Sequence, residues 1–210
     1  MEELRTARRT QAERREEARQ RVLQAATALV ALHGSRAVSL AAVGEAAGYS
    51  RGIVHHHFGS KARLLEEVIK YTQTFDVPAD SATGLSRLTD FVGAYLSGLH
   101  ERSPRSEAFL KLWTESAGAE PSLAELFAER DAQFREVLAQ YIVDGIDDGS
   151  IRSGVDPHTA AVAIIGLLRG SALMAFSTAR DVSAGDLAAV AVAGVERSLA
   201  ADAGFGFHLA

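Results

Sequence analysis

The stretch Ser39–Lys61 reads SLAAVGEAAGYSRGIVHHHFGSK, and the positions of its glycines and serines predict the fold. Glycine-containing turns divide it into short helical segments at residues 40–47 and 51–58, and a further helix runs from Lys61 to about residue 71 or 75. A serine precedes each of the three segments, and serine is a favoured N-cap because its hydroxyl accepts a backbone N–H of the first turn. Two short helices joined by Gly48, Tyr49 and Ser50 have the dimensions of a helix-turn-helix.

These two short helices have one apolar face and one face that points away from it. Gly48 can adopt the positive φ that a tight turn requires. A glycine at Gly52 costs a helix roughly 1 kcal/mol relative to alanine, which a close approach to an outside partner would explain. The N-terminal end of such a helix is the part that enters a DNA major groove. The buried contacts are expected from Val43, Ala47, Val54 and Phe58, and the residues pointing elsewhere are Arg51, Gly52, Ile53, His55 and His56.

The remainder of the chain also reads as helix, because alanine is abundant and strand-type alternation is scarce. Upstream, a helix from about Glu13 to His33 ends at Gly34, where a C-cap glycine belongs. Downstream, the segment 76–84 is the best candidate boundary. The sequence therefore predicts an all-α fold of about nine helices. Its expected parts are a flexible basic N-terminal arm (residues 1–17), a three-helix helix-turn-helix DNA-binding domain (18–75) and a larger helical domain (76–210).

Charge is distributed unevenly along the 210 residues. Residues 1–70 contain 12 Lys and Arg against 8 Asp and Glu, whereas residues 71–210 contain 10 against 19, which gives +4 and −9 and sums to the net charge of −5. A basic segment on an acidic body indicates an anionic partner for the first part only. The excess of Arg over Lys fits phosphate and base recognition, but high-GC coding produces the same excess, so both explanations stay open.

Several classes of protein are excluded or disfavoured. The chain has no cysteine, which excludes disulfide frameworks, thiolate metal sites and cysteine nucleophiles. No secretory signal is visible, and the longest apolar run, Thr159–Leu168, stops at Arg169 and is too short to span a bilayer. We therefore expect a cytoplasmic protein with no membrane partner.

Residues 18–71 resemble the DNA-binding domain of the TetR family of bacterial transcriptional regulators. The resemblance is carried by Gly34, Ser39, the run VGEAAGYS at 43–50, GIV at 52–54, HFGSK at 57–61 and Leu64-Leu65. It implies phosphate contacts from Ser39, Tyr49, His55, His57 and Lys61, and base-edge contacts from Arg51, Gly52 and Ile53. Two departures are a glycine at Gly44, where the family usually has alanine, and His55, where it usually has a phosphate-contacting tyrosine. Both small residues suit the packing at position 44, so the second departure affects the phosphate contact and not the fold.

Two further patterns in the same stretch have ordinary explanations. The run His55-His56-His57 suggests a metal site, but successive helical side chains point about 100° apart and do not converge on one ion. The run Gly48–Gly52 matches G-x-S-x-G, but a nucleophile elbow needs a strand before the serine, and the preceding segment is helical. We therefore expect no metal, no cofactor and no catalytic residues. Ser50 is expected to be a helix cap.

The larger domain contains aromatic residues that could either pack as core or line a cavity. The family resemblance implies a small effector among these helices, with Phe91, Tyr95, Phe109, Trp113, Phe134 and Arg169 as its candidate contacts. Arg169 interrupts an apolar helix, where an unpaired charge would be costly. Three explanations stay open: its head reaches water, it meets an anionic effector, or it pairs with an acid such as Glu196 across a dimer.

The last two predicted helices are apolar nearly all round, which favours burial against a second copy of the chain. Small residues that would allow close helix approach are Ala160, Ala163, Gly166 and Gly170 on the first helix and Ala188, Ala191 and Gly194 on the second. The alternative is that both helices are buried within one chain.

The function predicted from these observations is sequence-specific DNA binding by a homodimeric repressor, released from a palindromic operator by a small-molecule effector. A DNA-binding regulator without an effector, constitutive or controlled by a protein partner, and an activator are the alternatives. A helical enzyme is a third possibility that no catalytic constellation supports.

Overall fold

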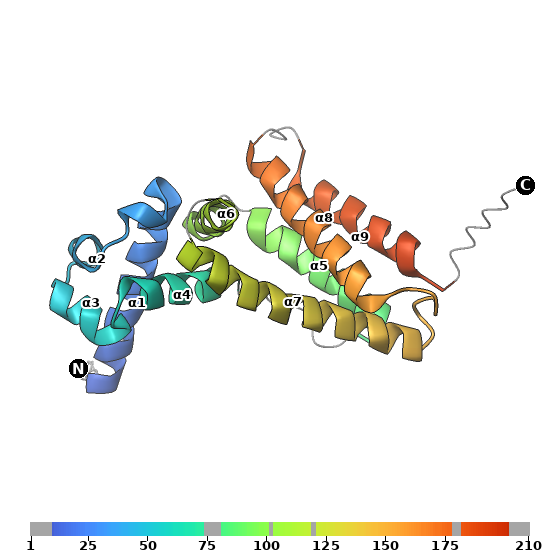
Figure 1. Ribbon diagram of the computed structural model, residues 1–210, viewed down its shortest axis with the longest axis horizontal. Coiled ribbons are helices and arrows are strands. Elements are labelled where there is room, and N and C mark those ends of the chain that lie inside the picture. Colours follow the sequence, from blue (N-terminus) through green and yellow to red (C-terminus); the bar gives the residue numbers. More distant parts are fainter. Residues whose placement is uncertain (1–9, 74–80, 101–102, 119–120, 178–181, 202–210) are drawn as a thin grey trace, which may run out of the picture.

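The computed structural model describes residues 10–73, 81–100, 103–118, 121–177 and 182–201, and within these ranges the chain forms nine α-helices and one short 3-10 helix (Figure 1). This confirms the predicted all-α fold. Parts of the predicted arm (1–9) and boundary (74–80), and the tail 202–210, lie outside the described residues. The helices are α1 (Gln11–His33), η1 (Ser35–Ala37), α2 (Leu40–Ala47), α3 (Arg51–Phe58), α4 (Lys61–Thr72), α5 (Gly84–His100), α6 (Pro104–Ser116), α7 (Pro121–Asp147), α8 (Pro157–Ser177) and α9 (Ala184–Leu199).

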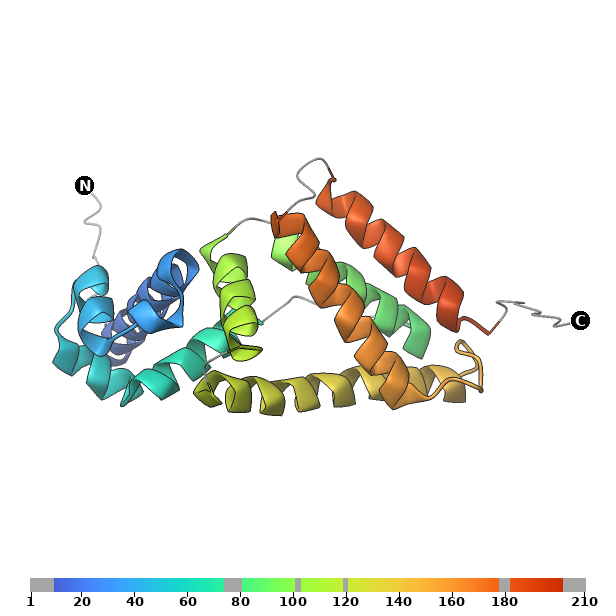
Figure 2. The ribbon, with the colours of Figure 1, turned by 45° about the horizontal axis from the view of Figure 1, so that its top comes forward.

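The first four α-helices form a head at one end of the molecule (Figures 1 and 2). Its core includes Val22 and Val30 of α1, Val54 of α3, and Leu64 and Val68 of α4, each with no solvent exposure. Helix α1 begins two residues before the predicted Glu13, because the Thr10 hydroxyl accepts from the backbone N–H of Glu13 while the Glu13 carboxylate accepts from that of Thr10. This capping box satisfies two otherwise unpaired donors and sets the start of the helix.

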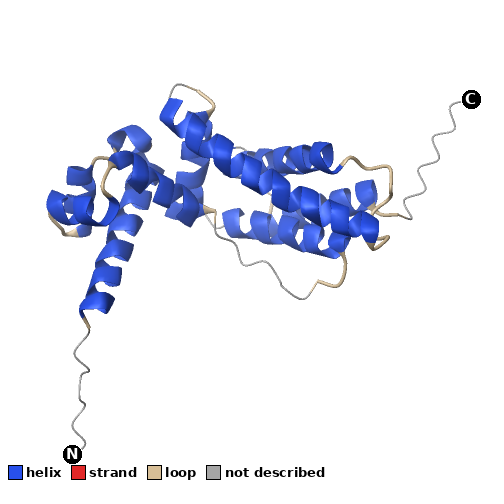
Figure 3. Cartoon of the chain, turned by 60° about the horizontal axis from the view of Figure 1, so that its bottom comes forward, coloured by secondary structure: helices blue, strands red, loops and turns tan. Residues whose placement is uncertain are grey.

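The body is a bundle of α5, α7, α8 and α9, and among the described residues the cartoon draws helices and loops but no strand (Figure 3). Helix α5 contacts α7, α8 and α9, and α7 extends from the bundle toward the head beneath α6 (Figure 2). One isolated antiparallel bridge joins Ile151 to Ala200. The buried side chains of Leu88, Leu138 and Leu168 form part of the centre of this bundle.

Helix α6 connects the head to the body. The Lys111 ammonium donates to the backbone carbonyls of Ala31 and Leu32 at the end of α1, each at 2.7 Å. The Glu115 carboxylate accepts from the backbone N–H of Ser35 at the start of η1. A cation near a helix C-terminus and an anion near a helix N-terminus both complement the local backbone dipoles. The end of α1 is therefore held to α6 from both sides, which sequence reasoning did not anticipate.

The outer faces of α8 and α9 leave large apolar side chains in solvent. Val162 is 53% exposed, Met174 52% and Val190 67%, and Leu167 and Leu173 are also exposed. A Cβ added at Gly166 or Gly170 would meet nothing within 4 Å. The alternative that both helices are fully buried within one chain is therefore wrong. The prediction that Ala188 and Ala191 line an outer interface is also wrong, because both are buried on α9, which packs against α5 of the same chain.

The apolar segment in α8 is longer than the sequence analysis assumed. The run considered in the sequence ended at Arg169, but the helix continues through it, and Pro157–Phe176 is long and apolar enough by length and composition to cross a membrane. In this structure the same helix packs against α7 and α5 and carries a buried charge near its middle. Its apolarity is thus accounted for by one face in the bundle and another left outside it.

Candidate DNA interface and effector cavity

The helix-turn-helix forms as its serine caps and glycine turn predict. The hydroxyls of Ser39, Ser50 and Ser60 each accept the backbone N–H three residues later, at 3.1, 3.4 and 3.2 Å, which starts α2, α3 and α4. Gly48 ends α2 in the left-handed region at φ 75°. The backbone N–H of Tyr49 donates to the carbonyl of Gly44 at 2.8 Å, which closes the turn. Local sequence signals are therefore enough to set the angle at which α3 is presented.

Gly44 lies where the turn passes closest to α2. A Cβ built on it would sit 2.7 Å from the carbonyl oxygen of Tyr49 and 3.2 Å from the carbonyl carbon of Ser50. Both neighbours are backbone atoms, so an alanine could be accommodated only by shifting the turn. In this chain Gly44 and the turn form one tightly packed unit, and a change at Gly44 would move α3.

The predicted DNA contacts lie on α3, at the starts of α2 and α4, and, for Tyr49, in the turn between α2 and α3. Val54 and Phe58 are buried in the head, as predicted, so the opposite side of α3 faces outward. Ile53 is 39% exposed. The exposed members of the predicted set are Ser39, Arg51, Gly52, Ile53, His55 and Lys61, and the half-buried ones are Tyr49 and His57. The structure thus leaves each of these side chains at least partly accessible.

His57 lies in a positively charged neighbourhood. Burial lowers its pKa below the ordinary value of 6.5, and His56, Arg15 and Arg19 lower it further. Arg19 also lies over the ring of Phe58, 5.7 Å from its centroid, and forms an ion pair with Glu67 of α4. Basic residues of α1 therefore lie beside the end of α3, and an anion bound there would meet positive charge from both helices.

The two alternative motifs in this region do not form sites in the described part of the chain. No group of three or more His, Asp or Glu side chains is placed to hold a metal ion there. The rings of His56 and His57 meet edge to face, with centroids 5.6 Å apart. The Ser50 hydroxyl accepts from the backbone of Ile53, as a helix cap does, and α2 precedes the turn where a nucleophile elbow would need a strand.

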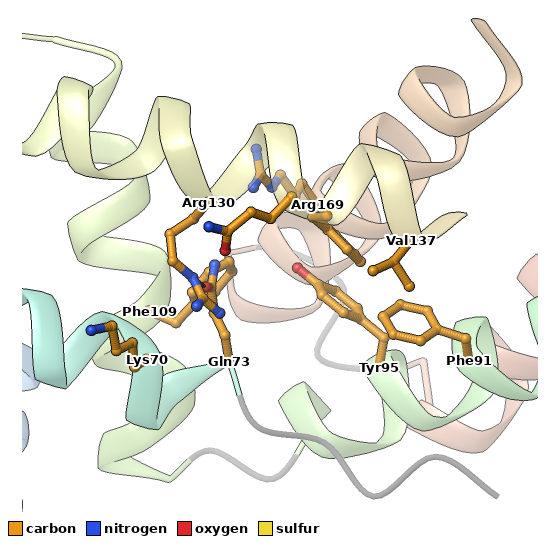
Figure 4. Close-up of a pocket in the computed structure, with 10 residues that line it drawn as sticks. Lys70, Gln73, Phe91, Tyr95, Phe109, Arg130, Val137 and Arg169 are labelled. Atoms are coloured by element: carbon orange, nitrogen blue, oxygen red, sulfur yellow. Dashed lines mark hydrogen bonds between the residues drawn. The ribbon is translucent and has the colours of Figure 1, made fainter. Parts of the chain in front are cut away.

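A cavity of about 600 Å³ lies between the body helices and the end of α4 (Figure 4). Trp113, the sixth predicted residue, does not line it, although the guanidinium of Arg169 lies 5.2 Å from the centroid of its ring. Of the predicted effector residues, Phe91, Tyr95, Phe109, Phe134 and Arg169 line the cavity. Lining residues that the sequence did not identify are Lys70, Gln73, Arg130, Gln133 and Val137.

One end of the cavity is aromatic. The rings of Tyr95 and Phe134 stack with centroids 6.0 Å apart, and that of Phe91 lies 5.4 Å from that of Phe134. Val137 completes this end beside Phe91 (Figure 4). Burial raises the pKa of the Tyr95 hydroxyl to about 12, although the neighbouring Arg169 acts in the opposite direction. At neutral pH Tyr95 is therefore a neutral hydrogen-bonding group within an apolar wall.

Arg169 is buried, with only 6% of its surface exposed, and its partner is Asp131 of α7. Its two terminal nitrogens donate to the two carboxylate oxygens of Asp131, one of them at 2.7 Å. Of the three explanations left open for Arg169, pairing with an acid is the one observed, but Glu196 of a second copy was the wrong partner, because α8 packs along α7 of the same chain and brings Asp131 within reach. The third guanidinium nitrogen, Nε, is buried and has no acceptor in the described structure.

The other end of the cavity is polar and includes the end of α4. Gln73, the C-cap residue of α4, accepts from Nε of Arg130 on α7 at 2.6 Å. The Lys70 ammonium donates to Glu66 at 2.6 Å and to Glu67 at 3.2 Å, all on α4. Figure 4 shows Lys70, Gln73 and Arg130 grouped on the side of the cavity away from Phe91. Helix α4 therefore has Lys61 at the predicted DNA surface and Gln73 in the cavity wall.

Relatives of the chain are regulators of transcription. The HTH-type transcriptional repressor KstR2 of Rhodococcus jostii is 26% identical over 162 residues, which cover 68% of this chain and 72% of the repressor. A putative regulator from Saccharomonospora viridis, solved with choline, aligns at 21% identity and a TM-score of 0.69 over 88% of this chain and 98% of its own. AibR, solved with isovaleryl coenzyme A and operator DNA, aligns at 18% identity and a TM-score of 0.63 over 84% of this chain and 97% of its own. The two structural matches support the fold.

Family models match both parts of the chain. The model for bacterial regulatory proteins of the tetR family matches residues 22–68, and the model for the C-terminal part of BetI-type transcriptional repressors matches residues 85–200, which is more than half of the chain. Members of this family are DNA-binding regulators and not enzymes, as the sequence predicted. The chain belongs to the TetR family of bacterial transcriptional regulators.

Proposed function

We propose that the protein is a homodimeric repressor that leaves a palindromic operator when a small molecule occupies its cavity. Helix α4 is the single observation that carries this proposal. It starts at Lys61, beside α3, and its C-cap Gln73 lines the cavity. At 1.5 Å per residue its 12 residues span about 18 Å. An occupant that moves one end of a rigid helix also moves the other.

The DNA contacts of this proposal follow from the accessible side of the head. Arg51, Gly52 and Ile53 meet base edges, with Arg51 placed to form a bidentate pair with guanine. Lys61 lies in the first turn of α4, where backbone N–H groups also attract phosphate. The proposed phosphate contacts are Ser39, Tyr49, His55, His57 and Lys61. The DNA-binding domain is assigned to residues 18–75 and the effector and dimer domain to residues 76–210.

The proposed dimer forms through the outer faces of α8 and α9. Val162, Leu167, Met174 and Val190 expose apolar surface on neighbouring helices, and Gly166 and Gly170 leave room for a helix to approach closely. Surfaces of this kind are buried when two copies pack about a two-fold axis. Two heads related by such an axis would read two half-sites of a palindrome. The place of action is the cytoplasm, where the operator lies.

The cavity favours an effector over the alternative of a regulator without one. A packed aromatic core would have supported that alternative, whereas about 600 Å³ falls within the range of small-molecule sites. AibR was solved with both an acyl-coenzyme A and operator DNA, which is a precedent for the two activities in this fold.

Two measurements test the proposal. The first is selection of bound sequences from a pool of random duplexes, which should enrich an inverted repeat with the wild-type chain and lose that enrichment with Arg51→Ala. The second is sedimentation, in which the wild-type chain should have the mass of two chains. Val190→Glu should shift it toward one chain, whereas Glu196→Gln, at an exposed position of the same helix, should not. Enrichment of no motif, or a monomer at micromolar concentration, would reject the corresponding part of the proposal.

A further inference from the structure

The cavity has a charge pattern that the rest of its domain does not have. Three of its ten lining residues are cationic, namely Lys70, Arg130 and Arg169, and none is acidic. Residues 71–210 nevertheless contain 19 acidic against 10 basic residues. Arg130 and Arg169 are therefore gathered at the cavity against the composition of residues 71–210, and Lys70, at the end of α4, adds a third cation.

The three cations differ in how much of their hydrogen-bonding capacity the protein already uses. Arg169 is largely neutralised by Asp131, but its buried Nε lacks an acceptor in the described structure. Lys70 is paired with Glu66 and Glu67. Arg130 donates through Nε to the neutral amide of Gln73, and no carboxylate of the described residues pairs with its terminal nitrogens. An arginine presents five N–H donors, so most of those on Arg130 remain for an outside acceptor.

The two ends of the cavity differ in chemistry. Phe91, Phe134 and Val137 give one end an apolar wall, whereas Arg130 and Gln73 give the other end a charged and polar one (Figure 4). A ligand that satisfied both ends would have an apolar body and an oxyanion at one terminus. A bidentate contact between a guanidinium and a carboxylate or phosphate is among the strongest hydrogen-bonded pairs.

We infer that the effector is an amphipathic anion, whose aromatic or acyl body lies against Phe91 and Phe134 and whose terminal carboxylate or phosphate binds Arg130. This inference rests on the proposed effector role of the cavity and names the chemical class that fills it. It argues against quaternary ammonium ligands such as choline, because three cationic side chains and no carboxylate line the cavity.

The same geometry indicates how the anion would act on the head. Arg130 is on α7, and its described partner is Gln73, at the end of α4. An oxyanion bound to the terminal nitrogens of Arg130 would share the guanidinium with the amide oxygen of Gln73 and lie near Lys70 of α4. The charge of the ligand would therefore act on α4, which begins at Lys61. A neutral ligand of the same shape would fill the aromatic end without engaging this contact.

A matched series of ligands tests the inference on the full-length wild-type protein without DNA. The series has one body and four head groups: 6-phenylhexanoate, 6-phenylhexyl phosphate, 6-phenylhexanol and 6-phenylhexyltrimethylammonium. Trp113 is the only tryptophan of the sequence and its ring lies 5.2 Å from the guanidinium of Arg169, which lines the cavity, so its fluorescence reports occupancy through Arg169. One or both anions should bind at least tenfold more tightly than the alcohol, the size of one charge-assisted hydrogen bond, and comparison of the two anions identifies the oxyanion.

Variants of Arg130 then test whether this residue is the one that binds the anionic head group. Arg130→Gln should reduce anion affinity about tenfold and leave the affinity of the alcohol unchanged, and Arg130→Lys should restore part of the loss. Arg135→Gln removes the same charge from an exposed position of α7 that does not line the cavity, and it should change neither affinity.

Three results would overturn the inference: equal binding of alcohol and anions, tightest binding of the trimethylammonium compound, or no saturable change with any of the four. Failure of the proposed function gives a different result. In that case the anions bind through Arg130 but leave the affinity for the selected operator unchanged.

Discussion

The ion pair between Arg169 and Asp131 makes an asymmetric prediction about stability. The guanidinium is 7% exposed, whereas the carboxylate is 29% exposed and reaches solvent. Removing one partner of a buried ion pair is costly mainly because the other charge stays buried without compensation. The two single variants therefore leave different charges behind, and their costs should differ.

Asp131→Asn leaves a buried guanidinium whose Nε also lacks an acceptor in the described chain. We expect a loss of about 3 kcal/mol in the free energy of unfolding, at the lower end of the range for breaking buried pairs because Asn keeps one acceptor oxygen. Arg169→Met leaves a carboxylate that water can solvate, and it removes the unsatisfied Nε. Its expected cost is about 1 kcal/mol, so the two variants should differ by about 2 kcal/mol.

Urea unfolding followed by far-ultraviolet circular dichroism measures this difference, at one protein concentration because dimerisation contributes to apparent stability. Arg169→Met combined with Asp131→Leu removes both charges and should recover most of the loss of Asp131→Asn. Arg135→Met is the control for an exposed position of α7 and should change stability by less than about 0.5 kcal/mol. An Arg169→Met variant as unstable as Asp131→Asn, or a double variant less stable than both, would refute the reasoning.

Three further predictions concern the head and its connection to α6. Lys61→Ala should lower affinity for all duplexes and reduce the salt slope by about 1, whereas an unchanged slope would remove Lys61 from the phosphate contacts. DNA affinity should rise as pH falls. Because burial and nearby positive charges lower the pKa of His57, its contribution should appear only below about 6.5 and disappear in His57→Asn; flat binding from pH 8 to pH 5.5 would contradict this. Lys111→Met should cost about 1–2 kcal/mol in urea unfolding, because it removes the cation that binds the last carbonyls of α1, and an unchanged midpoint would show that this contact contributes nothing.

The helix-turn-helix could be predicted because its determinants are local. Ser39, Ser50 and Ser60 cap the helices that follow them, and Gly48 ends α2, each through a contact within a few residues. The burial of Val54 and Phe58 follows from one helical turn of spacing. Gly44 was identified as small, but the 2.7 Å approach of the turn to its missing Cβ required the structure.

The cavity could be predicted only in part, because tertiary packing creates it. Aromatic residues such as Phe91 and Phe134 were identified by type, whereas Arg130 has the pattern of an ordinary solvated position on an amphipathic helix. Its role depends on α7 lying against the end of α4, which brings Gln73 to it across 57 positions of sequence. Glu196 was wrongly suggested as the partner of Arg169 for the same reason, since the observed partner, Asp131, is 38 positions away in sequence.

The claim on which this account depends is that α3 reads sequence. Fluorescence anisotropy of the wild-type chain with the selected inverted repeat and with a scrambled duplex, titrated across salt concentrations, tests it most directly. The account predicts binding at least about a thousandfold tighter to the repeat, with a steep salt slope on both duplexes. Equal affinity for the two duplexes at every salt concentration would contradict it.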